Sequence, residues 1–173
     1  MTTEATVGLN DVDLNAVGAL VAAIQDDPEN AETTWRATVD WRGGFRSEST
    51  VREFAPVPSD EPAGLGGSDT AANPVEQLLG ALGNCLAVGY AANASAAGIA
   101  LRDLRIELEG DLDLHTFLGF ADGNAGYESI RATVRIESDA DEAAIDELHR
   151  KVTATSPVGH TLGRPVPVDI QLA

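Results

Sequence analysis

The sequence contains a single cysteine, Cys85, in 173 residues. One thiol cannot form a disulfide within the chain, and proteins without disulfides are typical of a reducing cytoplasm. Long hydrophobic runs are also missing, since no segment approaches the ~20 consecutive apolar residues of a membrane-spanning helix. The first residues lack the basic start and apolar core of a signal peptide. We therefore expect a cytoplasmic protein that has no membrane partner.

Basic residues are scarce. The chain has 11 lysines and arginines against 28 acidic residues, which gives a formal net charge of −17, and Lys151 is its single lysine. Such a surface repels a phosphate backbone and excludes nucleic acid as a partner. The acids are spread over patterned segments rather than gathered in a tail. We interpret this composition as halophilic, because molar salt screens charges over ~3 Å and removes the self-repulsion.

The first half of the chain combines helical and extended patterns. With 43% hydrophobic residues, it is long enough for one globular domain with a core of its own. Apolar residues at helical spacing predict a helix over 14–24. Alternation over 34–41 and 45–54 around a Gly-Gly turn predicts a β-hairpin. Prolines and glycines then indicate an exposed loop over 55–72.

The second half continues with a mainly apolar helix over 73–97, two strands over 101–114 and 130–136, and an acidic helix that begins at Asp139 or Asp141. The alternating segment from Pro165 to Leu172 predicts a closing strand. The resulting order, α-β-β-α-β-β-α-β, lacks the strict alternation of a doubly wound sheet. It therefore favours an α+β fold.

The central helix carries the cysteine. Asn73 is a good N-cap, and Glu76 stands three residues later, where a capping box has its acid. Cys85 lies about three turns further on, too far from the helix N-terminus for the dipole to activate it. A reactive thiolate there needs a cation from elsewhere, and Arg42 and Arg46 beside the hairpin turn are the candidates. The same pattern also fits an inert, buried thiol.

Other groupings of polar residues give weaker signals. The Gly64–Gly67 segment lacks the Lys-Ser/Thr of a phosphate-binding loop. Asp111, Asp113 and His115 alternate as a metal site would, but a solvated acidic strand explains them better in so acidic a chain. Ser156 and His160 lie one helical turn apart without the elbow of a serine hydrolase. We therefore expect neither a metal nor another cofactor.

The stretch from Asn73 to Cys85 reads Asn-Pro-Val-Glu-Gln-Leu-Leu-Gly-Ala-Leu-Gly-Asn-Cys. It resembles the central-helix motif of the OsmC/Ohr family, in which an Asn/Ser-Pro-x-Glu-x-Leu-Leu run leads into Ala-Leu-x-x-Cys. Further segments occur in the family's order: the Trp41 hairpin before this helix, then Glu109 to Asp113, the Ser156-Pro-Val segment and the Pro165 segment. The resemblance extends from about Trp35 to the C-terminus.

The resemblance implies an intertwined α+β homodimer with sites at the subunit interface. It also implies that Cys85 is the peroxidatic cysteine, which reduces organic hydroperoxides and becomes a sulfenic acid. In the family, an arginine of the N-terminal sheet and a glutamate near the start of the central helix assist this cysteine. We expect residues 1–30 to form a helical extension and residues 31–173 to form the OsmC-like domain.

The chain departs from the family pattern at two positions. Ser156 stands where the second, resolving cysteine belongs, as in a subgroup with Ser-Pro-Val at this point. The family's glutamate directly follows the proline, whereas here Val75 has that place and Glu76 comes one residue later. A shift of one residue turns a helical side chain by ~100°, so Glu76 also fits a purely capping role.

The sequence is compatible with two functions. In the first, Cys85 is a one-cysteine peroxidase that an arginine activates and an external thiol reductant regenerates. Ser156 then provides a hydrogen bond, and His160 is a candidate proton donor. In the second, the dimer binds a small hydrophobic ligand at its interface cavity without redox turnover.

Overall fold

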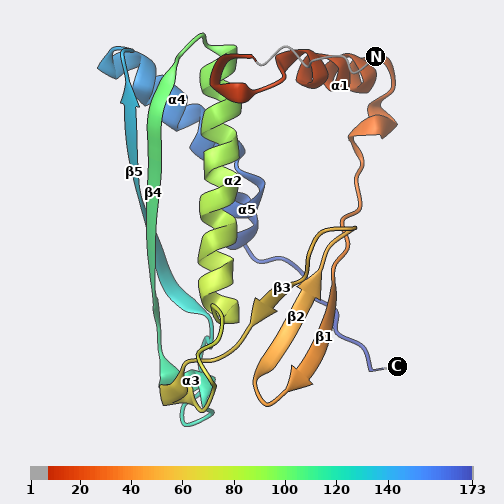
Figure 1. The fold of residues 1–173 in the computed structure, drawn as a ribbon, viewed down its shortest axis with the longest axis vertical. Helices are drawn as coiled ribbons and strands as arrows, with labels where there is room; N and C mark the ends of the chain where they lie inside the picture. Colours follow the sequence, from red (N-terminus) through yellow and green to blue (C-terminus); the bar gives the residue numbers. More distant parts are fainter. Residues whose placement is uncertain (1–7, 173) are drawn as a thin grey trace. The chain divides into compact units, whose positions relative to one another are not determined.

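The computed structural model describes residues 8–172. The chain divides into two compact units. One holds residues 16–78, and the other holds the N-terminal residues to Asn15 together with residues 79–173. Figure 1 labels the helices and strands of the two units.

The unit of residues 16–78 contains most of helix α1 (Leu14–Asp26), the short 3-10 helix η2 (Pro28–Ala31) and a three-stranded antiparallel sheet. The sheet has the order β1-β2-β3, with bounds Thr38–Gly43, Arg46–Thr50 and Val57–Ser59. Strands β1 and β2 form the expected hairpin, and Thr38 pairs with Thr50 at its open end. Strand β3 lies within the segment that the sequence predicted to be an irregular loop.

The loop after β3 is held together by one buried carboxylate. Asp60 is 1% exposed. It accepts hydrogen bonds from the amides of Glu61, Ser68 and Thr70 and, at 2.8 Å, from the Thr70 hydroxyl. Burial would raise the pKa of Asp60, but these hydrogen bonds outweigh burial and hold the pKa below its usual value. The loop is therefore ordered although it contains many prolines and glycines.

The other unit is built on the central helix α2 (Pro74–Ala96), whose first turn belongs to the unit of residues 16–78. It also contains the antiparallel strands β4 (Leu101–Leu112) and β5 (Tyr127–Ser138). Three helices complete it, α3 (Leu114–Phe117), α4 (Glu142–Thr155) and α5 (Pro157–Leu162). The 3-10 helix η1 (Leu9–Asp11) precedes α1. Figure 1 shows α2 running alongside the β4–β5 ribbon.

The core of this unit lies between α2, α4 and the inner face of the β4–β5 ribbon. Its buried apolar residues come mainly from the two helices: Leu82, Leu86, Tyr90, Ala94, Ile99, Leu148 and Val152. A Cβ atom added at Gly89 would lie 2.9 Å from Cγ1 of Val152, so the glycine is needed for the close approach of α2 and α4. Tyr90 is fully buried, and its hydroxyl forms a hydrogen bond with Nδ1 of His149, which is itself exposed.

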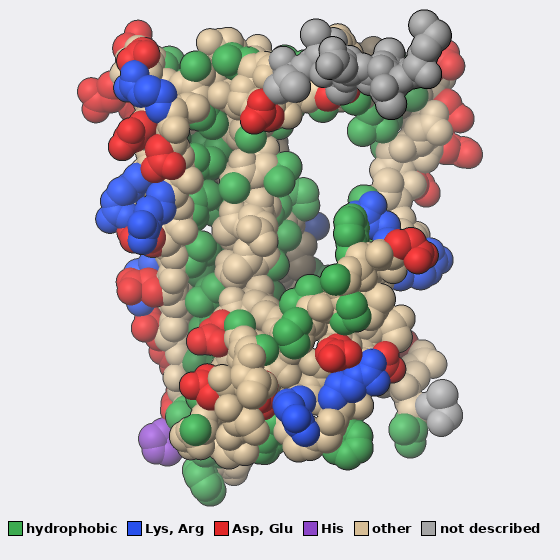
Figure 2. Space-filling view, in the orientation of Figure 1, with side chains coloured by type: hydrophobic (Ala, Val, Ile, Leu, Met, Phe, Trp, Pro, Cys, Tyr) green, Lys and Arg blue, Asp and Glu red, His purple; other side chains and the backbone are tan. Residues whose placement is uncertain are grey.

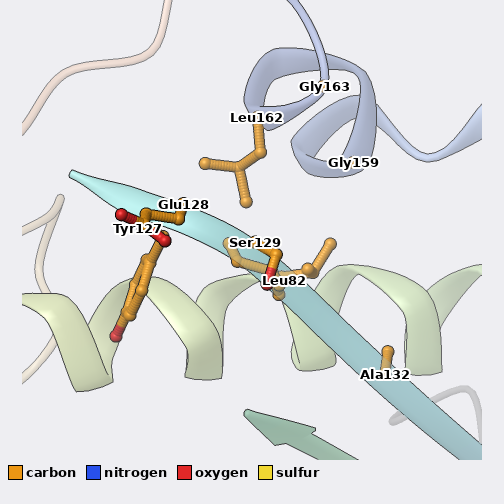
Figure 3. Close-up of a pocket in the computed structure, with 9 residues that line it drawn as sticks. Leu82, Tyr127, Glu128, Ser129, Ala132, Gly159, Leu162 and Gly163 are labelled. Carbon is orange, nitrogen blue, oxygen red and sulfur yellow. The ribbon is translucent and has the colours of Figure 1, made fainter. Parts of the chain in front are cut away.

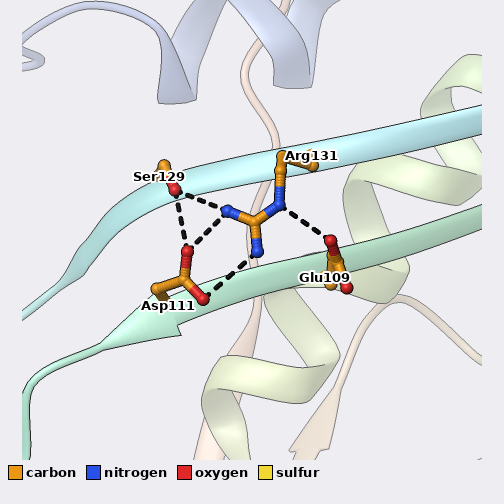
Figure 4. A network of polar contacts seen from close by, with 4 residues as sticks. All are labelled: Glu109, Asp111, Ser129 and Arg131. Carbon is orange, nitrogen blue, oxygen red and sulfur yellow. Dashed lines mark hydrogen bonds and ion pairs between the residues drawn. The ribbon is translucent and has the colours of Figure 1, made fainter.

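The outer face of the β4–β5 ribbon carries ion pairs. Arg131 on β5 donates to Glu109 and to Asp111 on β4, and Ser129 also donates to Asp111 (Figure 4). The hydrogen bond from Arg131 holds the pKa of Asp111 below its usual value. Figure 2 shows acidic and basic side chains interspersed along this ribbon. The ribbon therefore has an apolar inner face and a charged outer face.

The sequence predicted the long elements better than the short ones. The central helix, the hairpin, both long strands and the acidic helix with its Asp141 cap are present. The closing strand predicted over Pro165–Leu172 is absent, and this described segment is irregular. A strand needs a hydrogen-bonded neighbour, and alternation alone does not supply one. Among the described residues, no helix is long and apolar enough to cross a membrane.

Candidate functional site

The central helix begins with the capping box that the sequence predicted. The side chain of Asn73 accepts from the amide of Glu76 at 2.9 Å, and the Glu76 carboxylate accepts from the amide of Asn73 at 2.8 Å. Asn73 is buried, and its side-chain amide also donates to Glu61 at 3.3 Å. These bonds fix the first turn of α2. They also engage the Glu76 carboxylate at the helix start.

Cys85 lies half-buried in the middle of α2, where it faces the junction of α4 and α5. Its Sγ is 3.3 Å from Oγ of Ser156. Ser156 is the C-cap of α4 and the N-cap of α5, and only 5% of it is exposed. The structure therefore brings together two residues that are 71 positions apart in the sequence.

The hydrogen bonding of Ser156 defines its direction. Its Oγ accepts from the amide of Gly159 at 3.1 Å, as an N-cap does. The proton of the hydroxyl is then available for the sulfur of Cys85, because a hydroxyl has one donor besides its two acceptor lone pairs. The Ser156 hydroxyl can thus donate to a thiolate at Cys85.

A pocket of about 330 Å³ opens at this pair of residues. Most of its lining residues are apolar or small, and they come from α2, from α4 and from the start of α5. The lining residues are Asn84, Cys85, Val88, Gly89, Val152, Thr155, Ser156 and Pro157. Cys85 and Ser156 are the two members that the sequence singled out. Asn84 and Val88 are missed by motif reasoning, although a spacing of four residues places them on one helical face beside the cysteine.

The other candidate site residues, His160, Arg42 and Arg46, are not among the residues that line the Cys85 pocket. His160 is exposed on α5, with Nε2 3.0 Å from the carbonyl oxygen of Ala154. Arg42 and Arg46 belong to the hairpin in the unit of residues 16–78. Arg46 donates to the carbonyl of Gly43 at 3.3 Å.

Arg42 is held within its own hairpin. Its Nε donates to Glu48 at 2.9 Å, and Asp40 lies 3.5 Å from its Nη2. The hydrogen bond and the charge of Glu48 raise the pKa of Arg42. The guanidinium is therefore cationic, and it already has two carboxylate partners on the strand surface.

A second pocket, of about 310 Å³, lies between β5, α5 and the middle of α2. Figure 3 shows Leu162 of α5 pointing toward β5, with Leu82 of α2 at the floor of the hollow. Neither Cys85 nor a histidine is among its lining residues. It offers apolar contact without an evident reactive group.

The Asp111, Asp113 and His115 pattern does not assemble a metal site. Asp111 is occupied by Arg131 and Ser129, and Asp113 caps α3 by accepting from the amide of His115 at 2.8 Å. In the described part of the chain, no group of three or more His, Cys, Asp or Glu side chains is placed to hold a metal ion. These residues act in strand and helix structure.

Comparison with known proteins gives a family and a fold. The family model described as "OsmC-like protein" matches residues 66–171, which is more than half of the chain. The structure of the OsmC like protein from Mycoplasma pneumoniae is similar, with a TM-score of 0.67 and 20% identity over 76% of this chain and 89% of that chain. A search of the curated proteins gives no match.

Two further similar structures carry names that refer to hydroperoxides. The organic hydroperoxide resistance protein OsmC from Legionella pneumophila has a TM-score of 0.58 and 16% identity, over 76% of this chain and 91% of that chain. The organic hydroperoxide resistance protein OhrB of Bacillus subtilis has a TM-score of 0.50 and 18% identity, over 74% and 89%. At these identities the similarity shows a shared fold.

Proposed function

Because this chain belongs to the OsmC-like protein family, we propose that it is a one-cysteine thiol peroxidase that reduces organic hydroperoxides at Cys85. The observation that carries the proposal is the contact between Cys85 and Ser156 at the edge of an apolar pocket. A thiol beside a hydroxyl donor, open to an apolar hollow, suits a substrate with an organic body and a polar O–O group.

The chemistry has three steps. The Cys85 thiolate attacks the terminal oxygen of the hydroperoxide, the O–O bond breaks, and the alkoxide takes a proton and leaves as an alcohol. The sulfur is now a sulfenic acid. An external thiol condenses with it to form a mixed disulfide and water, and a second external thiol releases the Cys85 thiol and an oxidised disulfide.

The presence of serine at position 156 explains why the proposed reductant is an external thiol. A cysteine at this position would attack the sulfenic acid within the chain, but a serine hydroxyl cannot form a disulfide. Ser156 instead offers its hydroxyl as a hydrogen-bond partner of Sγ of Cys85 at 3.3 Å. The same hydroxyl remains fixed by its cap bond from Gly159.

Further groups act as assistants in this proposal. Arg42 or Arg46 supplies positive charge to the thiolate, in keeping with the family's arginine of the N-terminal sheet. Glu76 fixes the start of the helix that carries Cys85, and His160 is a proton donor on α5. Before Arg42 can pair with the thiolate, its guanidinium must leave Glu48 and Asp40.

The apolar surface of the smaller unit supports a homodimer. Among residues 16–78 no hydrophobic side chain is buried, and several large ones are more than half exposed: Trp35, Val39, Trp41, Phe45, Phe54 and Val57. An apolar surface of this extent is usually buried against another protein surface, and a second copy of this chain would bury it.

We assign residues 1–30 to an N-terminal extension and residues 31–173 to the OsmC-like domain. We also assign the protein to the cytoplasm, where thiol reductants are available.

The proposal is tested with cumene hydroperoxide and the wild-type and Cys85→Ser proteins. Peroxide loss is followed with dithiothreitol and, separately, with a thioredoxin-like reductant, and dimedone is used to trap the sulfenic acid for mass spectrometry. We expect turnover and a dimedone adduct at Cys85 for the wild type only. Equal rates for the two proteins would rule out the peroxidase.

The apolar lining of the pocket also favours a second function, in which the protein binds a small hydrophobic ligand without turnover. Val88, Val152 and Pro157 would contact such a ligand, and Cys85 would only line the pocket. In that case an apolar fluorescent probe binds the wild type and Cys85→Ser equally, and neither protein consumes peroxide.

A further inference from the structure

The open end of the β1–β2 hairpin carries a hollow that the peroxidase chemistry does not use. Its volume is about 340 Å³, and it lies wholly within the unit of residues 16–78. Residues from both strands and from their flanks line it: Arg36, Ala37, Thr38, Asp40, Thr50 and Arg52. Two arginines and two threonines therefore line one hollow.

The register of the hairpin explains this grouping. Thr38 and Thr50 are direct cross-strand partners. Arg36 and Arg52 each lie two residues outside this pair, beyond the ends of β1 and β2, so the open end of the hairpin brings both arginines to the hollow beside the threonines. The arrangement is almost symmetric, with an arginine and a threonine from each side.

These two arginines differ from most others in the chain by lacking an acidic partner. Within residues 8–172, neither Arg36 nor Arg52 forms an ion pair. Six other arginines are paired with carboxylates, although they too are exposed: Arg42, Arg102, Arg105, Arg131, Arg135 and Arg150. The one acid that lines the hollow, Asp40, lies 3.5 Å from Arg42. In a chain with a net charge of −17, two guanidiniums in one hollow without a carboxylate of their own form a local positive site.

Arg52 is held in an uncommon backbone conformation. Its φ is +52°, in the left-handed region that residues other than glycine rarely adopt. Its guanidinium carbon lies 4.6 Å from the centre of the Phe54 ring, so the ring supports the charged group from one face. Strain of this kind persists where the surrounding structure fixes it, and it occurs often at ligand-binding positions.

We propose that this hollow binds the phosphate group of a small phosphomonoester. Two guanidinium forks and two hydroxyls offer about six donors, whereas a carboxylate has only about four lone-pair sites on its two oxygens. The three terminal oxygens of a phosphate accept that number. The hollow is larger than phosphate alone and leaves room for a small organic group. The site is distinct from the Cys85 pocket, with which it shares no lining residue.

The test measures binding of inorganic phosphate by ³¹P line broadening and by calorimetry on the full chain, at one fixed KCl concentration. Arg36→Gln and Arg52→Gly are compared with Arg150→Gln, which removes one positive charge on α4, far from this hairpin in the sequence. Glycine suits the left-handed φ of residue 52, so Arg52→Gly removes the guanidinium without straining the backbone. Melting temperatures of all variants serve as the control for folding.

We expect phosphate to bind the wild type and Arg150→Gln with affinities within twofold of each other. Arg36→Gln and Arg52→Gly should each weaken binding at least tenfold, while the melting temperature of Arg52→Gly stays within about 3 °C of the wild type. Acetate should bind at least tenfold more weakly than phosphate. The proposal is overturned if both hairpin variants keep wild-type affinity, if Arg150→Gln is weakened as much as they are, or if acetate binds as well as phosphate.

Discussion

The contact between Cys85 and Ser156 makes a direct prediction about a single residue. Their side-chain atoms are 3.3 Å apart, so a cysteine in place of Ser156 would bring a second sulfur next to Sγ of Cys85. In Ser156→Cys, one equivalent of cumene hydroperoxide should therefore produce an internal disulfide instead of a dimedone-reactive sulfenic acid. Intact-protein mass spectrometry should show a loss of about two mass units, because two thiol protons are lost.

Thr155→Cys is the matched control for this experiment, since Thr155 lines the same pocket but is the neighbour of the residue in contact. It should keep two titratable thiols or a sulfenic acid after the same treatment. If Ser156→Cys also retains two free thiols after oxidation, the two side chains do not approach each other in solution.

Asp60 links stability to pH. The pKa of its buried carboxyl is held below the usual value, so the charged form stabilises the fold above pH ~3.8 and this contribution is lost as the pH falls through the folded-state pKa. Asp60→Asn places an amide group opposite amide donors of the loop. We expect its melting temperature at pH 7 to fall by roughly 5 °C, and its stability to depend less on pH below 4 than that of the wild type.

Asp69→Asn is the control for Asp60→Asn, because Asp69 lies in the same loop with an exposed side chain, and asparagine tolerates its φ of +54°. Thermal melts of both variants between pH 3 and pH 7 provide the measurement. Equal losses in the two variants would mean that the carboxylate network around residue 60 does not hold the loop.

At the scale of elements, the crossing of α2 and α4 depends on a glycine. A methyl group at Gly89 would lie 2.9 Å from Val152, a core residue that is 1% exposed. Gly89→Ala should lower the free energy of unfolding by about 1–3 kcal/mol through overpacking. Because Gly89 and Val152 also line the Cys85 pocket, the same change should reduce peroxidase activity.

Gly80→Ala in the same helix should change the free energy of unfolding in the opposite direction. An added methyl group there meets no atom within 4 Å, so the change should raise the free energy of unfolding by up to ~1 kcal/mol through helix propensity alone. Urea denaturation of both variants decides the matter. A loss of stability in Gly80→Ala, or none in Gly89→Ala, contradicts this account of the helix crossing.

The same elements show what the sequence can specify. The start of α2 was predictable because the capping box and Pro74 are local signals, and the structure forms both bonds of the box. The closing strand was not, because pairing partners are not encoded in alternation. The meeting of Cys85 and Ser156 follows from the packing of α2 against the α4–α5 junction, which no local pattern reveals. Only the resemblance to the OsmC/Ohr family connected these two positions.

At the scale of the whole molecule, the net charge of −17 makes stability depend on salt. Like charges repel in dilute buffer, and molar KCl reduces the screening length to ~3 Å. We expect the melting temperature to rise steadily between 0.1 and 2 M KCl. Unchanged stability over that range would count against a halophilic adaptation, and sucrose at matched viscosity is the control for non-ionic effects.

The exposed apolar side chains of residues 16–78 make a prediction about assembly. Light scattering of the full 18.0 kDa chain should give a mass of about twice that value at micromolar concentration, since a surface of this kind is covered in stable proteins. A monomer at every concentration would contradict the homodimer. It would leave the Cys85–Ser156 contact intact, because both residues belong to the same unit of one chain.

The position of Ser156 between two helices has a spectroscopic consequence. Its Oγ accepts the amide proton of Gly159 and also contacts Sγ of Cys85, so a change at the sulfur alters the electron density at the acceptor of that amide. The Gly159 amide resonance should therefore shift when Cys85 is oxidised or alkylated. A backbone proton that never touches the substrate thus becomes a natural probe of the redox state of the thiol.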